Sequence, residues 1–100
     1  MSLPFELTEE AKKDIGDSFT YYESEQPGLG TYFLEKLDHC FRSISENPFK
    51  HPSKRRFFRE ALVSKFPFLV VFEVLEDKLL IYAVFHTSKN PRKKPRKKKP

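Results

Sequence analysis

The chain has 100 residues, of which 38% are hydrophobic and 15% aromatic, so it is long enough for one domain with its own core. One cysteine, Cys40, excludes an internal disulfide and indicates a reducing compartment; with no signal-peptide pattern and no apolar run near the ~18 residues of a membrane span, we expect a soluble, cytoplasmic protein. The net charge of +5 is local, because residues 89–100 carry eight Lys and Arg and leave residues 1–88 with eleven basic and fourteen acidic side chains.

A short strand and a helix are expected first. Phe5-Glu6-Leu7 reads as an edge strand, and Thr8 followed by Glu9 and Glu10 is typical of a helix start. Apolar residues then recur every three or four positions, as Ala11, Ile15, Phe19 and Tyr22. The charged residues lie mostly off this stripe: Lys12, Lys13, Asp14, Asp17 and Glu23.

A second helix follows the break at Pro27-Gly28. From Leu29 the stripe resumes as Phe33, Leu37, Cys40 and Ile44, widened by Leu34 and Phe41. Asn47-Pro48 ends it, because proline cannot continue a helix. The pair predicts an antiparallel helical hairpin.

Residues 47–56 contain two prolines and no apolar period, which predicts a loop. Residues 57–63 predict a strand, with Phe58, Glu60 and Leu62 on one face and Phe57, Arg59, Ala61 and Val63 on the other. We expect this strand to pair with residues 66–74.

The centre of the fold is predicted in residues 66–85. Two apolar runs, 66–74 and 79–85, are joined by the polar turn Glu76-Asp77-Lys78, which favours an antiparallel hairpin in the middle of a small sheet. The order β-α-α-β-β-β predicts an α+β fold, with the helical hairpin packed on a small antiparallel sheet. We expect the domain to cover residues 1–91, and residues 92–100, a run of cations punctuated by proline, to be a disordered basic tail.

Motifs in this order resemble the RelE/ParE toxins of bacterial toxin-antitoxin (plasmid stabilisation) pairs over residues 5–91. The matching pieces are Gln26-Pro27-Gly28-Leu29-Gly30, Asn47-Pro48, Arg59 ahead of Phe66-Pro67-Phe68, and Ala83-Val84-Phe85-His86 with Lys89-Asn90-Pro91. The family often has Tyr where Phe72 stands, Arg where Lys89 stands and an aromatic residue soon after Pro91. The likeness is closer to ParE-like members, described as poisons of DNA gyrase, than to RelE-like ones, which cut messenger RNA on the ribosome.

The resemblance leaves three readings of function. The first is a ParE-like toxin that acts by binding, with a cognate antitoxin as partner and gyrase as target. The second is a RelE-like, ribosome-dependent mRNA endoribonuclease, and the third is a non-toxic degenerate member. The antitoxin is expected to add a strand or lay a helix over aromatic residues that the helices leave uncovered.

An endoribonuclease would need a base, an acid and cations for the phosphate. Glu60 or His86 could move protons, and a basic surface for nucleic acid or another target is formed by Lys54, Arg55, Arg56, Arg59, Lys89 and Arg92. The structural alternatives are an Arg59 pair with an acid such as Glu73, a solvated Glu60 and an edge histidine at position 86. Because neighbours on a strand alternate, Arg59 and Glu60 should face opposite ways.

No metal ligand set and no cofactor motif is visible. His39, Cys40, His51 and His86 lack the spacing of a zinc site. Cys40 lies on the apolar stripe of the second predicted helix, which favours a small core residue. We therefore expect neither a metal nor a small-molecule cofactor.

Overall fold

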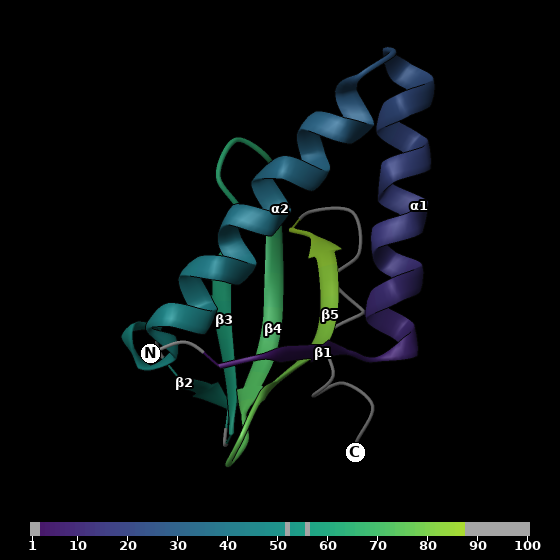
Figure 1. The fold of residues 1–100 in the computed structure, drawn as a ribbon. Helices are drawn as coiled ribbons and strands as arrows, with labels where there is room; N and C mark the ends of the chain where they lie inside the picture. The colour runs from purple at the N-terminus through teal and green to yellow at the C-terminus, as the bar shows by residue number, and fades with distance from the viewer. Residues whose placement is uncertain (1–2, 52, 56, 88–100) are drawn as a thin grey trace.

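The protein is described by a computed structural model that places residues 3–51, 53–55 and 57–87 (Figure 1). Two helices lie on one face of a five-stranded sheet, so the predicted α+β class and the helical hairpin are confirmed. The elements in chain order are β1 Phe5–Leu7, α1 Glu9–Glu25, α2 Leu29–Glu46, the 3-10 helix η1 Pro48–Lys50, β2 Ser53–Arg55, β3 Phe58–Leu62, β4 Phe68–Val74 and β5 Leu79–His86. The tail predicted at 92–100 lies outside the described residues, as does the end of the domain predicted at 91.

Helix α1 begins where its sequence signals predicted. The hydroxyl of Thr8 accepts a hydrogen bond from the backbone N–H of Ala11 at 3.0 Å, and Glu9 and Glu10 occupy the first turn. An N-cap oxygen satisfies an otherwise unpaired donor, and acids near the helix N-terminus interact favourably with the macrodipole. The N-terminal end of α1 is therefore fixed by local chemistry.

The turn between the helices is fixed by one glycine and one carboxylate. Gly28 has φ of 91°, in the left-handed region where a side chain is strained. Glu23, near the end of α1, accepts hydrogen bonds from the backbone N–H groups of Gly28 and Gly30, both at 2.9 Å. These two donors belong to the first residues of α2, so a side chain of one helix caps the start of the next.

The sheet is mixed, with the strand order β1-β5-β4-β3-β2. The pairs from β5 to β2 are antiparallel as predicted, but β1 pairs with β5 in parallel, so the expectation of a wholly antiparallel sheet is wrong at this edge. β1 leads directly into α1, and after α2 the chain enters the sheet at the opposite edge, with β2. The strands from β2 to β5 then follow one another back across the sheet, so the first strand and the last strand are neighbours (Figure 1).

The segment predicted as a loop, residues 47–56, contains more regular structure than expected. It holds η1 and the short strand β2, which pairs with β3 through Ser53 opposite Arg59 and Arg55 opposite Phe58. A three-residue strand next to proline carries no apolar alternation, because an edge strand needs only backbone hydrogen bonds to pair. The hydrophobic periodicity of the sequence therefore could not predict β2.

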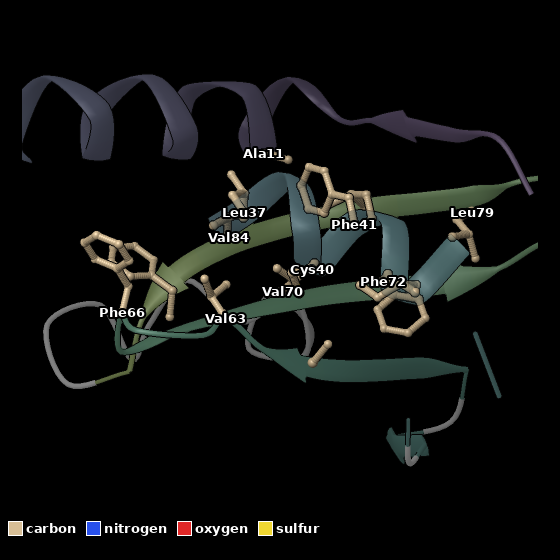
Figure 2. Close-up of a cluster of buried hydrophobic side chains, with 14 of the residues drawn as sticks. Ala11, Leu37, Cys40, Phe41, Val63, Phe66, Val70, Phe72, Leu79 and Val84 are labelled. Atoms are coloured by element: carbon tan, nitrogen blue, oxygen red, sulfur yellow. The ribbon is translucent and has the colours of Figure 1, made fainter. Parts of the chain in front are cut away.

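The core fills the space between the helices and the sheet. Apolar side chains from α1, α2 and the helix side of β3, β4 and β5 meet there (Figure 2). The largest fully buried ones are Phe33, Phe72, Ile44, Leu79, Ile81, Val70 and Val84 on this side and Phe85 on the other. The predicted alternation on β3 is confirmed, since Ala61 is buried and its neighbour Leu62 is 71% exposed.

A β-bulge in β5 receives two polar groups from the start of the chain. The register shifts between Val71 and Phe72, which leaves Tyr82 as the extra residue of β5. Thr8 donates its hydroxyl proton to the carbonyl of Tyr82 at 2.9 Å, and the Asp14 carboxylate accepts from the backbone N–H of Val84 at 3.0 Å. Asp14 is 4% exposed although it belongs to the charged residues placed mostly off the apolar stripe, and its carboxylate satisfies the backbone donor of the buried Val84.

Candidate functional site

Arg59 is the one predicted target-binding cation whose side chain is described. It lies on the helix side of β3, where it donates a hydrogen bond to the backbone carbonyl of His51 at 2.7 Å and stacks over the ring of Phe49 at 4.9 Å. Phe49 is 66% exposed, so the stacked pair lies at the surface. A guanidinium held in this way keeps further N–H donors for an anionic or carbonyl partner.

The alternative of an Arg59–Glu73 pair is wrong. Arg59 lies opposite Phe72, whose ring belongs to the core under the helices, whereas Glu73 lies opposite Phe58 on the other face. The two charged groups therefore point away from each other across the sheet. Side chains at adjacent positions of a strand point to opposite faces of the sheet. Arg59 and Glu73 therefore cannot form an ion pair although β3 and β4 are neighbours.

The other predicted cations are placed only in part. Lys54 and Arg55 belong to β2, at the edge of the sheet, and their side chains are not described. Arg56, Lys89 and Arg92 lie outside the described residues. A continuous basic surface that includes all six residues stays a prediction.

Glu60 and His86, the predicted proton-transfer residues, are not brought together. Glu60 lies opposite Val71, on the face of the sheet away from the helices. His86 lies opposite Phe68 on the helix side, with its ring edge-on to the Phe68 ring at 5.3 Å between centroids. One reacting group could not contact both side chains through the sheet, so any catalytic role would rest on one of them alone.

His51, which the sequence presents only as a histidine without ligand spacing, lies beside Arg59. Its ring is edge-on to Phe72 at 5.9 Å, and Nε2 is buried with no hydrogen-bond partner among the described residues. Burial, with the nearby charges of Lys50 and Arg59, lowers the pKa of His51. Both effects disfavour the positively charged form of the ring beside the Arg59 and Phe49 pair.

The second feature is the helix-free face of the sheet. Its side chains are Phe58, Glu60 and Leu62 from β3, Leu69, Val71 and Glu73 from β4, and Leu80, Tyr82, Ala83 and Phe85 from β5. Val71, Ala83 and Phe85 are buried at its centre, and the apolar residues Phe58, Leu69 and Tyr82 pack around them. The bulge in β5 interrupts the alternation of side chains, so that the neighbours Tyr82 and Ala83 both lie on this face.

Tyr82 and Glu73 form a polar pair within this apolar face. The phenol of Tyr82 donates a hydrogen bond to Glu73 Oε1 at 2.7 Å, and its ring is edge-on to Phe58 at 4.9 Å between centroids. Burial, then the hydrogen bond and negative charge of Glu73, raise the pKa of Tyr82 to about 12. The pair was not predicted, because in the sequence Tyr82 is one of several largely apolar positions. The signal that could have indicated a polar contact was Glu73, a charged residue inside the apolar run of β4.

Ionisation of Tyr82 should lower the free energy of unfolding of the protein at high pH. Its pKa in the folded chain, about 12, is above the ordinary value of 10, so the folded state holds the proton more tightly. The stabilisation is complete below pH 10 and is lost as the pH rises from 10 to 12. We expect absorbance titration at 295 nm to show one late-ionising tyrosine that is absent in Tyr82→Phe and titrates earlier in Glu73→Gln. An unchanged curve in Tyr82→Phe would contradict this assignment.

No metal centre is indicated among the described residues. Across 3–51, 53–55 and 57–87, no three His, Cys, Asp or Glu side chains gather where they could hold a metal ion. Cys40 is buried in the core, its thiol lies 3.7 Å from the carbonyl oxygen of Leu62, and burial raises its pKa to about 11. A thiol with so high a pKa is a poor nucleophile at neutral pH.

In the same described ranges, neither helix has the length and apolar character needed to cross a bilayer.

Comparisons with known proteins agree with this architecture. The solved structure of a chromosomal ParDE TA system from P. aeruginosa matches with a TM-score of 0.74 at 15% sequence identity, covering 85% of this chain and 96% of that one. At this identity the likeness shows a shared fold. No curated protein sequence matches the chain. The family model described as the ParE toxin of the type II toxin-antitoxin system parDE matches residues 5–91, and the chain therefore belongs to the ParE toxin family.

Proposed function

We propose that the protein is the toxin of a type II toxin-antitoxin pair and acts in the cytoplasm by binding its target, DNA gyrase, without catalysing a reaction. The observation that carries the proposal is the family match over residues 5–91, which spans every described helix and strand. The separation of Glu60 and His86 by the sheet supports binding over mRNA cleavage, because these two predicted proton-transfer residues cannot act together on one substrate.

The helix-free face is the proposed docking surface for the cognate antitoxin. Around its buried centre of Val71, Ala83 and Phe85 lie partly exposed apolar and aromatic side chains, namely Phe58, Leu69, Leu80 and Tyr82. Neither described helix covers it, since both pack on the other side (Figure 1). A segment of the antitoxin laid across this face would bury apolar area in the manner of other peptide-recognition surfaces.

Induction in a bacterial host distinguishes the target classes. We expect growth arrest with filamentation and a DNA-damage response, relieved when the small protein encoded beside this gene is co-expressed. Purified toxin is expected to trap cleaved DNA with gyrase. The matched variants Glu60→Gln and His86→Ala should keep the growth arrest. Cut messages in induced cells, lost in either variant, would instead establish an endoribonuclease, and normal growth would establish a non-toxic member.

A further inference from the structure

Glu73 is an unusual residue for its place in the sheet. It lies in the run of apolar residues that forms β4, with Phe58 directly opposite on β3 and Leu80 directly opposite on β5. It is neither fully buried nor fully exposed. Within residues 3–51, 53–55 and 57–87, none of the ion pairs includes it, and its hydrogen-bond donor is the phenol of Tyr82.

A partner that covered this face with apolar side chains alone would desolvate the Glu73 carboxylate. Removing a carboxylate from water without a counter-charge is strongly unfavourable, and the single bond from Tyr82 replaces only part of its hydration. A lysine or arginine from the partner would neutralise the charge. The rings of Phe58 and Tyr82, 4.9 Å apart, would offer such a cation a further favourable contact.

We propose that Glu73 is the charged anchor of the helix-free face and receives one lysine or arginine side chain from the antitoxin segment that docks there. The inference rests on the proposed function and adds the chemistry of recognition: a basic residue flanked by apolar ones. The partly exposed side chains of Phe58, Leu69 and Leu80 take the apolar neighbours, and Glu73 fixes the register of the segment. Charge complementarity selects this occupant, because an acidic or wholly apolar segment would leave the carboxylate unpaired.

The test uses the full chain and its cognate antitoxin, sought as a small reading frame beside the gene, with the two proteins purified together and separately. Glu73→Gln preserves shape and removes the charge, and we expect it to weaken the complex by about tenfold or more. Glu25→Gln, at the exposed C-terminal end of α1, is the matched control and should change affinity less than about twofold. Tyr82→Phe removes the hydrogen bond to the carboxylate but keeps the negative charge, so it should weaken the complex less than Glu73→Gln does.

Partner variants identify the residue that Glu73 receives. Each lysine and arginine of the antitoxin is changed to glutamine in turn, and one change should weaken binding to the wild-type toxin but not to Glu73→Gln, as a double-mutant cycle requires for a contacting pair. Denaturant unfolding of each toxin variant checks that the fold is intact. If Glu73→Gln does not fold, Glu73→Asp, which keeps the charge, should still couple to the same antitoxin residue.

Failure of the proposed Glu73 anchor and failure of the proposed function give different results. If the complex forms and Glu73→Gln binds as tightly as the wild type, the anchor is excluded while the antitoxin partnership stands. If the neighbouring protein does not bind the wild-type toxin, the proposed function itself fails. If truncation after Pro91 abolishes the effect of Glu73→Gln, the carboxylate serves the chain's own C-terminal cations and the proposal is overturned.

Discussion

Replacing Phe33 by alanine is expected to destabilise the folded chain by about 3–5 kcal/mol. Phe33 has no exposed surface, and its ring lies 5.4, 5.3 and 5.0 Å from the rings of Tyr22, Phe66 and Phe68. It therefore joins α1, α2 and the start of β4. Truncation removes the apolar area and leaves a cavity among aromatic rings that cannot all move inwards.

Urea unfolding followed by circular dichroism measures this effect. Total stabilities of small domains are about 5–15 kcal/mol, so the variant should lose much of its folded population well below the wild-type midpoint. The control is Leu34→Ala, the next residue of α2, which is 38% exposed and should cost far less. Equal losses in the two variants would mean that α2 does not present Phe33 to the sheet.

Two glycine-to-alanine changes are expected to have opposite signs. A Cβ at Gly30 would lie 2.8 Å from two ring carbons of Phe19 and 2.8 Å from its backbone oxygen, so Gly30→Ala should destabilise the protein by about 1–3 kcal/mol. The ring could shift, but the carbonyl belongs to α1 and cannot. A methyl group at Gly16 would have nothing within 4 Å, so Gly16→Ala should stabilise the protein by about 0.5–1 kcal/mol through helix propensity.

Thermal unfolding of the two variants side by side provides the measurement. Both changes place alanine in a helix, so their intrinsic propensity gains are alike and the difference reports the close approach of α1 and α2 at the turn. An increase in melting temperature for both variants would show that the helices separate there without cost.

The sequence was sufficient for the parts of the fold that depend on periodicity. The stripe through Phe33, Leu37, Cys40 and Ile44 predicted α2 and its buried face, and the alternation of residues 57–63 predicted which side chains of β3 share a face. The helix boundaries followed from Thr8, Gly28 and Pro48, each of which acts on its immediate neighbours. Local physics of this kind is visible without knowing the fold.

Contacts between distant segments could not be predicted in the same way. The bulge at Tyr82 has no local signal, yet it places Tyr82 and Ala83 on the same face of β5, and the bond between Asp14 and Val84 spans 70 positions of the chain. The parallel pairing of β1 and the strand β2 depend on backbone hydrogen bonds, which any residue type except proline can donate. Family resemblance identified the class of protein, but the candidate anchor at Glu73 required the register of three strands.

The adjacency of β1 and β5 bears on when this toxin can first exist as a folded molecule. Thr8 and Asp14 bond to Tyr82 and Val84, more than two thirds of the chain away. A nascent chain synthesised from its N-terminus has no partner for these groups until β5 has emerged, so α1 cannot dock beforehand. Docking of α1 therefore waits until β5 has been synthesised, so any surface that needs the complete sheet becomes available to a partner only after that point.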